Sequence, residues 1–370
     1  MDLFSIMASP EAADELSIKD LTGYEIVAQL VAPGEWKLPL LDISIRVPAD
    51  FTEGIAIEDL VADSDRLIRI WRAVGFMLSM GSTILPYEAL SAPANGLPFN
   101  DALIPVKFTA ADNVDLTLAA ILGAGIFVQD GHRYFFSRSA YLQSMPRMFS
   151  NYRPNYRQWS SIVYVDSGEF HHPLRLPNPA QGSCVYKRYI PNLKKIFSLR
   201  MAKQEDFAMW ASWMNNPRVS KFWGMANDED KQAQYFAQIL SDKHVYPLIG
   251  QFDGESFLYT EVYWAAEDNL SRHVPINPFD RGFHLLVGEE KFRGPHMVAA
   301  WLQSIQHFIF LDDVRTDKAM LEPRYDNAKL IGYLTGAGFH KDREFNFPHK
   351  RSAWMCITRE EFYNNWKVGF

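Results

Sequence analysis

The chain has little cysteine, no long apolar run and no surplus of positive charge, and each shortage excludes a class of protein. Its 370 residues include two cysteines, Cys184 and Cys356, which lie far apart and match no zinc-binding or redox spacing. Without a disulfide framework, a cytoplasmic setting is the simpler expectation. The net charge of −7 at pH 7 argues against a general binder of nucleic acid or anionic membranes, because both need a cationic surface.

Several familiar sequence signatures are missing as well. The longest apolar run, Leu116–Val128, is too short to span a bilayer and is expected in the protein core. The first residues are acidic and lack the basic-then-apolar layout of a signal peptide. There is no Walker motif, dinucleotide fingerprint or Gly-x-Ser-x-Gly elbow, so direct transfer is favoured over a covalent intermediate.

The length suits two domains. In the first half, residues 40–49 and 131–142 alternate as strands do, and residues 57–78 have the period of a helix. The segment Pro173–Gly182 contains three prolines and is predicted to be a linker. We therefore predict an α/β domain over 1–182 and a second domain over 183–370.

The second half has a regular order of elements. A strand over 185–202 is followed by a helix that ends at Asn216-Pro217 and a second helix over 228–242. A hairpin over 245–264 turns at Asp253-Gly254, and a strand covers 280–290. A helix, a short strand at Lys318–Leu321, a further helix and a last strand over 350–358 complete the order β-α-α-β-β-β-α-β-α-β.

Five motifs in this order resemble the GCN5-related N-acetyltransferase (GNAT) superfamily, and in particular its siderophore acyltransferases. They are "ASWMNNPRVSKFW", "PLIGQFDGESFLYTEVYW", "DRGFHLLVGEEKFRGP", "FLDDVRT" and "EPRYDNAKLIGYLTGAGF". The resemblance covers about half of the chain, from Val185 to Phe362. It implies a central mixed, mostly antiparallel, twisted sheet flanked by helices. The first half has only a diffuse likeness to longer members, so a degenerate GNAT-like domain without a coenzyme A site is one option for it.

The resemblance also implies a binding site for an acyl-CoA, with acetyl-CoA the leading choice. In that family a Gly turn at a helix start binds the pyrophosphate, because free N–H groups and the positive end of the helix dipole attract anions. Here Pro295-His296 replace the small residues of the family turn. The residues expected to bind coenzyme A are Leu286, Val287, Gly288, Lys291, Arg293, Gly294, His296 and Asn327. No metal is expected, and His171-His172 match no metal site.

His284, on the strand before the Gly turn, is the candidate general base. A strand histidine that is merely hydrogen-bonded is the alternative, but imidazole is the usual proton acceptor near neutral pH. Glu322 and Asp326 could orient His284 or hold the amine, and could equally cap the following helix. One of the two carboxylates, rather than both, is expected in the catalytic role.

The candidate substrate contacts are drawn from the polar loop after residue 264 and from cations near the site. Each has a plain alternative, namely a core aromatic or a solvated charge. They are Trp264, Glu267, Asp268, Arg281, Lys350 and Arg351. The cations would hold a substrate carboxylate and the acids an α-amino group.

The activity implied is acylation of an N-hydroxylated amine to a hydroxamate in siderophore biosynthesis. N6-hydroxylysine with acetyl-CoA is the leading pair, and N-hydroxyornithine, an N-hydroxy diamine and succinyl-CoA remain open. An ordinary amine or aminoglycoside acetyltransferase is a second hypothesis, and a non-catalytic CoA-binding scaffold is a third. Expected partners in the pathway are a flavin N-monooxygenase and a siderophore synthetase, and the first domain would cover the amine site or form a homodimer surface.

Overall fold

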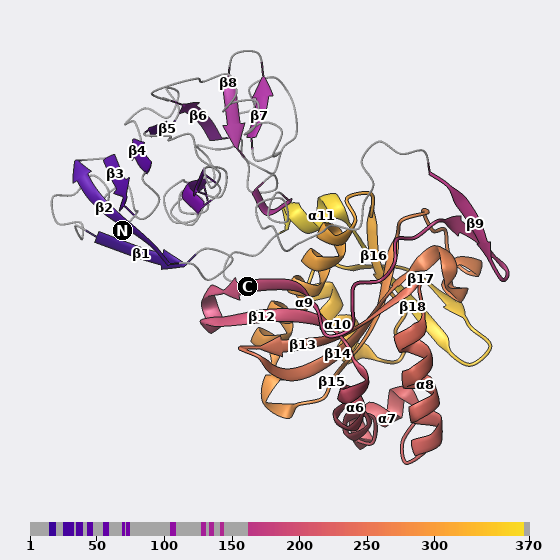
Figure 1. The fold of residues 1–370 in the computed structure, drawn as a ribbon. Coiled ribbons are helices and arrows are strands. Elements are labelled where there is room, and N and C mark those ends of the chain that lie inside the picture. Colours follow the sequence, from indigo (N-terminus) through magenta and orange to yellow (C-terminus); the bar gives the residue numbers. More distant parts are fainter. Residues whose placement is uncertain are drawn as a thin grey trace. The chain divides into compact units, whose positions relative to one another are not determined.

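The computed structural model (Figure 1) describes residues 162–365 without a gap. Before them it describes the short stretches 15–19, 25–32, 35–39, 43–46, 55–58, 69–70, 72–74, 104–108, 127–130, 133–136 and 141–143. The chain forms two compact units, 1–152 and 153–370. Among the described residues, no helix combines the length and the apolar character that a membrane span requires.

The division between the units lies earlier than the predicted boundary at 182/183. The predicted linker follows the hairpin of β9 (Tyr164–Ser167) and β10 (Phe170–Pro173), and both belong to the second unit. Side chains fix this segment in place: Arg175 Nε donates to Glu267 Oε1 at 2.7 Å, and Asn178 Nδ2 donates to the carbonyls of Asp242 and Val245. Its prolines therefore mark an extended segment bound to the domain surface, not a hinge.

The first unit contains an eight-stranded sheet. Its strands are β1 (Glu15–Lys19), β2 (Glu25–Ala32), β3 (Glu35–Leu38), β4 (Ile43–Arg46), β5 (Ile55–Glu58), β6 (Ile104–Phe108), β7 (Phe127–Asp130) and β8 (Arg133–Phe136). They lie in the order β1-β2-β3-β4-β5-β6-β8-β7, with β5 and β6 parallel and the other neighbours antiparallel. The strands predicted over 40–49 and 131–142 contain β4 and β8.

Two predictions for this unit fall partly outside the described residues. Of the helix predicted over 57–78, residues 69–70 and 72–74 are described and helical, and Ile70, Ala73 and Val74 are buried there. Residues 55–58 form β5, so the helix starts later than predicted. Of the apolar run Leu116–Val128, only its last two residues are described, and Phe127 is buried.

The second unit repeats the same strand order. Its strands are β11 (Cys184–Ile190), β12 (Lys195–Met201), β13 (Val245–Phe252), β14 (Glu255–Trp264), β15 (Arg281–Val287), β16 (Lys318–Leu321), β17 (His340–Asn346) and β18 (Arg351–Thr358). They lie as β11-β12-β13-β14-β15-β16-β18-β17, again with the fifth and sixth strands parallel. The predicted mixed, mostly antiparallel sheet with helices is confirmed for this unit.

The helices of the second unit follow the prediction with one correction, and one predicted strand needs a correction too. They are α6 (Phe207–Met214), α7 (Pro217–Trp223), α8 (Glu229–Ser241), α9 (Pro295–Asp312), α10 (Ala328–Gly336) and α11 (Arg359–Asn364). The helix predicted before Asn216 ends at Met214, and a separate helix, α7, begins at Pro217 with the Asn216 side chain accepting from Arg218 N at 3.0 Å. The strand predicted over 185–202 is a hairpin that turns at Lys194, a residue with φ of 51°.

Helices α6 and α8 pack against β15 and its neighbour β14. Trp210 and Trp213 of α6 and Phe236 of α8 form one buried cluster with Tyr259 of β14 and Leu286 of β15. The long helix α9 contacts β11 and β16, and nearly all of its residues are buried. The C-terminal half of β15 is thus held between packed helices, with the start of α9 just beyond it (Figure 1).

Candidate active site

The site is built where two parallel strands part. β15 and β16 pair only at Arg281/Ala319 and Gly282/Met320. β15 then continues to Val287 while β16 stops at Leu321, so the sheet opens between them. His284 lies on β15 just past the last pair, and Glu322 follows β16 directly. The opening therefore brings a histidine and a carboxylate from distant parts of the sequence to one place.

The imidazole of His284 bridges two buried carboxylates. Its Nε2 lies 2.8 Å from Glu322 Oε1, and its Nδ1 lies 3.2 Å from Glu261 Oε2. The His284 side chain is 39% exposed, whereas the Glu322 and Glu261 side chains are 4% and 3% exposed. A substrate in the opening would consequently meet the imidazole and leave the carboxylates behind it.

Tyrosine hydroxyls hold both carboxylates. Tyr263 donates to Glu322 Oε2 at 2.8 Å, and Tyr235 and Tyr259 both donate to Glu261 Oε1 at 2.8 Å. The ring of Tyr263 lies so close to Gly282 that a β-carbon there would be 2.1 Å from the ring. Glycine is therefore required at 282 for Tyr263 to reach Glu322.

The charges of this group shift the pKa values in opposite directions. Burial alone would lower the pKa of His284, but Glu322 and Glu261 outweigh it and raise this pKa to about 10. Burial alone would raise the pKa of Glu322, but His284, Lys350 and the Tyr263 hydroxyl outweigh it and lower this pKa to about 2. The resting arrangement is an imidazolium between two carboxylates.

A cleft of about 570 Å³ runs from the end of β15 to the starts of α9 and α10. Helix α9 begins at Pro295, with Gly294 as its N-cap, so His296 and Met297 supply N–H groups of its first turn. Five of the predicted coenzyme A residues line this cleft: Leu286, Val287, Arg293, Gly294 and Asn327. Asn327 also caps α10, because its Oδ1 accepts from Leu330 N at 3.3 Å.

The other three predicted coenzyme A residues lie outside the cleft lining. Gly288 packs against Trp213, where a β-carbon would lie 2.2 Å from the indole, and its N–H donates to Phe257 O. Since that N–H is already bonded, Gly288 has none to offer a bound ligand. Lys291 is exposed and paired with Glu255, and the His296 side chain is also exposed.

Arg218 is a cleft residue that the sequence reasoning missed. It comes from α7, donates to the carbonyls of Val287 and Gly288, and pairs with Glu290 at 3.0 Å. It holds the turn between β15 and α9. Its place after Asn216-Pro217 was visible in the sequence, but nothing there showed that α7 would lie over that turn.

Glu261 was missed too. It is the single acid inside the apolar core of β14, and it is directly opposite His284 in the register of β14 and β15. An acid at such a position needs partners, and this was the available signal.

The two alternatives left open for the acids are separated by the structure. Glu322 bonds His284, whereas Asp326 is 46% exposed and receives two hydrogen bonds from the guanidinium of Arg324. The structure therefore brings Glu322, and not Asp326, to the imidazole.

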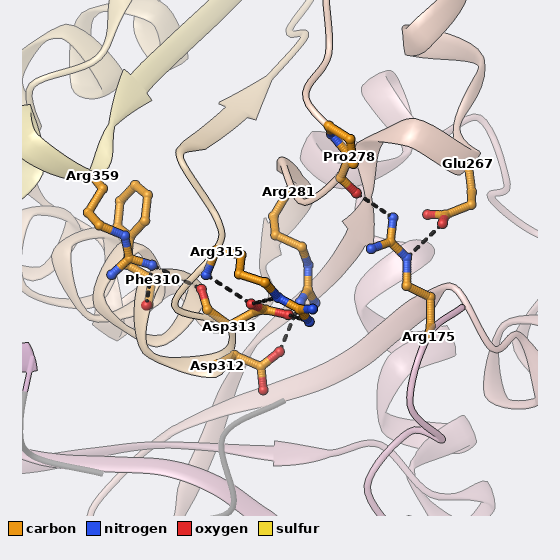
Figure 2. A network of polar contacts seen from close by, with 9 residues as sticks. All are labelled: Arg175, Glu267, Pro278, Arg281, Phe310, Asp312, Asp313, Arg315 and Arg359. Carbon is orange, nitrogen blue, oxygen red and sulfur yellow. Dashed lines mark hydrogen bonds and ion pairs between the residues drawn. The ribbon is translucent and has the colours of Figure 1, made fainter. Parts of the chain in front are cut away.

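Three of the predicted substrate contacts lie in the interior instead, and Figure 2 shows two of them, Arg281 and Glu267. Arg281 is fully buried, with its Nη1 donating to Asp312 Oδ2 at 2.8 Å. Trp264 lies between the guanidinium groups of Arg281 and Arg175, at 3.9 and 4.0 Å. Glu267 is bound by Arg175 and has a side chain only 2% exposed. Arg281 is thus bound to Asp312, Glu267 is bound to Arg175, and Trp264 lies against both guanidinium groups, so this arrangement leaves none of the three facing a substrate.

The remaining three predicted contacts differ in distance from the site. Lys350 Nζ donates to Glu322 O at 3.0 Å and lies 3.5 Å from Glu322 Oε1. Asp268 caps the turn at Leu270, and burial raises its pKa, with Glu322 and His284 among the nearby charges. Arg351 is 56% exposed and paired with Glu344. Lys350 and Asp268 thus belong to the surroundings of the imidazole, and Arg351 has an acid of its own.

Among the residues that the structure describes, one group has metal-ligand chemistry, and it includes Glu267. His172, His244 and Glu267 place a ligand atom each within 4.8 Å of one another. However, His172 Nδ1 is 2.7 Å from Glu267 Oε1, and Arg175 Nε donates to that same oxygen. Oε1 of Glu267 is therefore hydrogen-bonded within the protein.

Comparison with known proteins gives this geometry a context. Residues 202–347 match the family model of an acetyltransferase (GNAT) domain. The chain is 41% identical over 227 residues to N(6)-hydroxylysine O-acetyltransferase of Escherichia coli, covering 61% of this chain and 70% of that protein. It is 38% identical to hydroxyornithine transacylase SID3 of Ajellomyces capsulatus, over 52% of this chain and 44% of that one. It is also 38% identical to N(5)-hydroxyornithine:cis-anhydromevalonyl coenzyme A-N(5)-transacylase of Beauveria bassiana, over 54% of this chain and 44% of that one. The chain thus spans less than half the length of these two fungal relatives.

Proposed function

This chain belongs to the GNAT acyltransferase family, and we propose that it transfers an acyl group from acyl-CoA to the hydroxylated nitrogen of an N-hydroxy amine. The product would be a hydroxamate, as siderophore assembly requires. One observation carries the proposal: His284, bonded to Glu322, stands at the opening between β15 and β16, with the cleft at the start of α9 next to it.

The cleft is suited to an acyl-CoA. The first turn of α9 offers N–H groups and the positive end of a dipole, which favours a pyrophosphate, and Arg293 adds a cation at the cleft wall. Proline at the first position of α9 removes a donor that the chain would otherwise present there, but it is compatible with the helix. The His296 side chain is exposed and lies outside the cleft lining.

Chemistry at the site follows from the imidazole and its neighbours. The amine nitrogen attacks the thioester carbon, the C–S bond breaks, and His284 in its neutral form takes the proton of the N–H bond. The proton is finally carried by the departing thiol of coenzyme A. A hydroxylamine nitrogen is far less basic than a lysine amine and is already neutral at pH 7, so the imidazole removes one proton only.

N6-hydroxylysine with an acetyl donor is the leading substrate pair. The names of the three relatives support an N-hydroxylated amino acid, one a hydroxylysine and two a hydroxyornithine. Lys350 and Asp268 are the charged residues near the imidazole that could hold a carboxylate and an α-ammonium. An N-hydroxy diamine and a succinyl donor stay as alternatives, and a flavin N-monooxygenase and a siderophore synthetase are the partners that this chemistry needs.

The test compares acceptors. Purified full-length protein with acetyl-CoA should release thiol with N6-hydroxylysine or N5-hydroxyornithine, and the product should give the coloured complex of a hydroxamate with Fe³⁺. Lysine and an aminoglycoside are the matched acceptors without the hydroxylamine. Faster release with either of these would overturn the proposal in favour of an ordinary amine acetyltransferase. Coenzyme A binding without thiol release would instead favour a scaffold.

For the first unit we infer a GNAT-like sheet without a coenzyme A site. Its strand order and the place of its parallel pair match those of the second unit. However, only two residues separate β2 from β3, whereas α6, α7 and α8 stand at the corresponding place in the second unit. The fragment 153–370 should therefore retain coenzyme A binding, and loss of binding in a folded fragment would contradict this inference.

A further inference from the structure

Glu261 is buried, charged and in contact with the imidazole, yet no substrate could reach it. Its side chain is 3% exposed and lies behind His284 on β14. Leaving a carboxylate in the interior is unfavourable unless hydrogen bonds satisfy it, and here three groups do so: Tyr235, Tyr259 and His284. An arrangement of this kind needs an explanation beyond packing.

The contacts assign a separate task to each oxygen of Glu261. Oε1 accepts both tyrosine hydroxyls, one from α8 and one from the same strand. Oε2 is left for Nδ1 of His284 at 3.2 Å. Both hydroxyls donate to Oε1, so Oε2 faces Nδ1 as an acceptor, and in this contact Nδ1 carries a hydrogen.

We propose that Glu261 is a positioning residue of the acyl transfer: in the neutral ring it holds the Nδ1–H of His284, so that Nε2, which faces Glu322 in the resting state, is the nitrogen that exchanges a proton with the acceptor. The inference rests on the proposed function. In the step concerned, the N–H bond of the acceptor breaks as the Nε2–H bond forms, and the ring becomes an imidazolium. The negative charge of Glu261 stabilises that imidazolium from the side opposite to Glu322.

The charged groups around the ring set the expected pH dependence. Glu261 and the Tyr263 hydroxyl face it from β14, Glu322 from the segment after β16, Asp268 from the turn before Leu270, and Lys350 from the turn between β17 and β18. The carboxylates outweigh the one cation, in agreement with the raised pKa of His284. A reaction that needs neutral Nε2 should accordingly become faster as the pH rises into the alkaline range.

The first measurement is the titration of the His284 ring by NMR in the full-length protein, without any substrate. In Glu261→Gln the amide keeps the shape but loses the charge, so the pKa of His284 should fall by at least about one unit. Glu205→Gln, an exposed glutamate before α6, is the matched control and should leave the titration unchanged. An unchanged His284 titration in Glu261→Gln would overturn the proposal, and this readout stands even if the proposed acceptor is wrong.

The second measurement is the pH profile of kcat/KM with the hydroxylated acceptor. The acidic limb in Glu261→Gln should move to lower pH by the same amount as the NMR titration, and kcat on the plateau should fall about 10- to 100-fold. KM for acetyl-CoA should stay within threefold, because Glu261 does not line the cleft. A purely structural role predicts equal loss at every pH with no shift of the limb, and that result would also overturn the proposal.

Glu261→Asp keeps the charge but withdraws it from Nδ1, and serves if the Gln variant does not fold. In Glu261→Asp, the acidic limb of the kcat/KM profile should lie between that of the wild type and the limb expected without the charge of Glu261, and kcat should be lower than in the wild type. A limb equal to that of the wild type together with full kcat would show that contact with Nδ1 is irrelevant.

Discussion

Replacing Glu322 by Gln should lower kcat strongly while leaving coenzyme A binding almost unchanged. The change keeps the size of the side chain but removes the charge that accepts from His284 Nε2 at 2.8 Å and from the Tyr263 hydroxyl at 2.8 Å. Hydrogen bonds to a charged group contribute about 1.5–3 kcal/mol each. If one such contribution is lost where Glu322 stabilises the imidazolium formed in the reaction, kcat on the alkaline plateau should fall roughly 10- to 150-fold.

The matched control is Asp326→Asn. Asp326 is four residues further along the chain in the same "EPRYDN" motif, and it is exposed and paired with Arg324. Its substitution should change kcat by less than about threefold, since exposed ion pairs contribute little. The assay is thiol release from acetyl-CoA with N6-hydroxylysine, and calorimetry would give Kd for coenzyme A in both variants.

Two results would refute the reasoning on Glu322. One is a kcat for Glu322→Gln within threefold of the wild type, which would separate the carboxylate from the chemistry. The other is an equal loss in Asp326→Asn, which would show that the motif acts as a whole or that the exposed acid moves into the site. A weaker Kd for coenzyme A in Glu322→Gln would point to a displaced cleft instead of a damaged proton acceptor.

Two further predictions concern His284 and the candidate cations. The folded-state pKa of His284 is raised above its unfolded value, so its contribution to stability is complete below pH ~6.5 and is lost as the pH rises toward 10. The free energy of unfolding, measured by denaturant titration, should therefore fall over this pH window in the wild type and fall less in His284→Gln. An equal dependence of the free energy of unfolding on pH in the two proteins would count against this prediction. Arg281→Met should lower the melting temperature without changing the preference for an acceptor with a carboxylate, because Arg281 is buried and bound to Asp312. Lys350→Met should reduce that preference, measured as a ratio of kcat/KM values, about tenfold. If Lys350→Met keeps the preference, the substrate carboxylate binds elsewhere.

Local sequence signals were enough to predict most elements of the second unit. The turn at Asp253-Gly254 is a case where the residues dictate the backbone: both have positive φ, 50° and 85°, which glycine and aspartate tolerate in tight hairpins. The short strand at Lys318–Leu321 was predicted with its observed bounds. Boundaries failed where a local signal has two meanings, as at Pro217, which ends one helix and starts the next.

The site was predictable only in part, because side-chain partners depend on tertiary contacts. His284 could be chosen from its place before the Gly turn, but Glu261 could not be assigned to it without the register of β14 against β15. Arg281 illustrates the opposite error. It was predicted to hold a substrate carboxylate, yet it is fully buried, where its Nη1 donates to Asp312 and its guanidinium lies over the Trp264 indole. Sequence alone carries no signal for which of two arginines is enclosed.

Two residues of β15, His284 and Val287, depend on the helices between β12 and β13. Tyr235 of α8 holds Glu261, which holds His284, and Arg218 of α7 holds the carbonyl of Val287 at the last residue of β15. The same sheet order in the first unit has a two-residue link at the corresponding place, too short to form a helix. The shared topology therefore provides the parting strands, and the inserted helices make one of the two sheets able to hold a charged imidazole beside an acyl-CoA cleft.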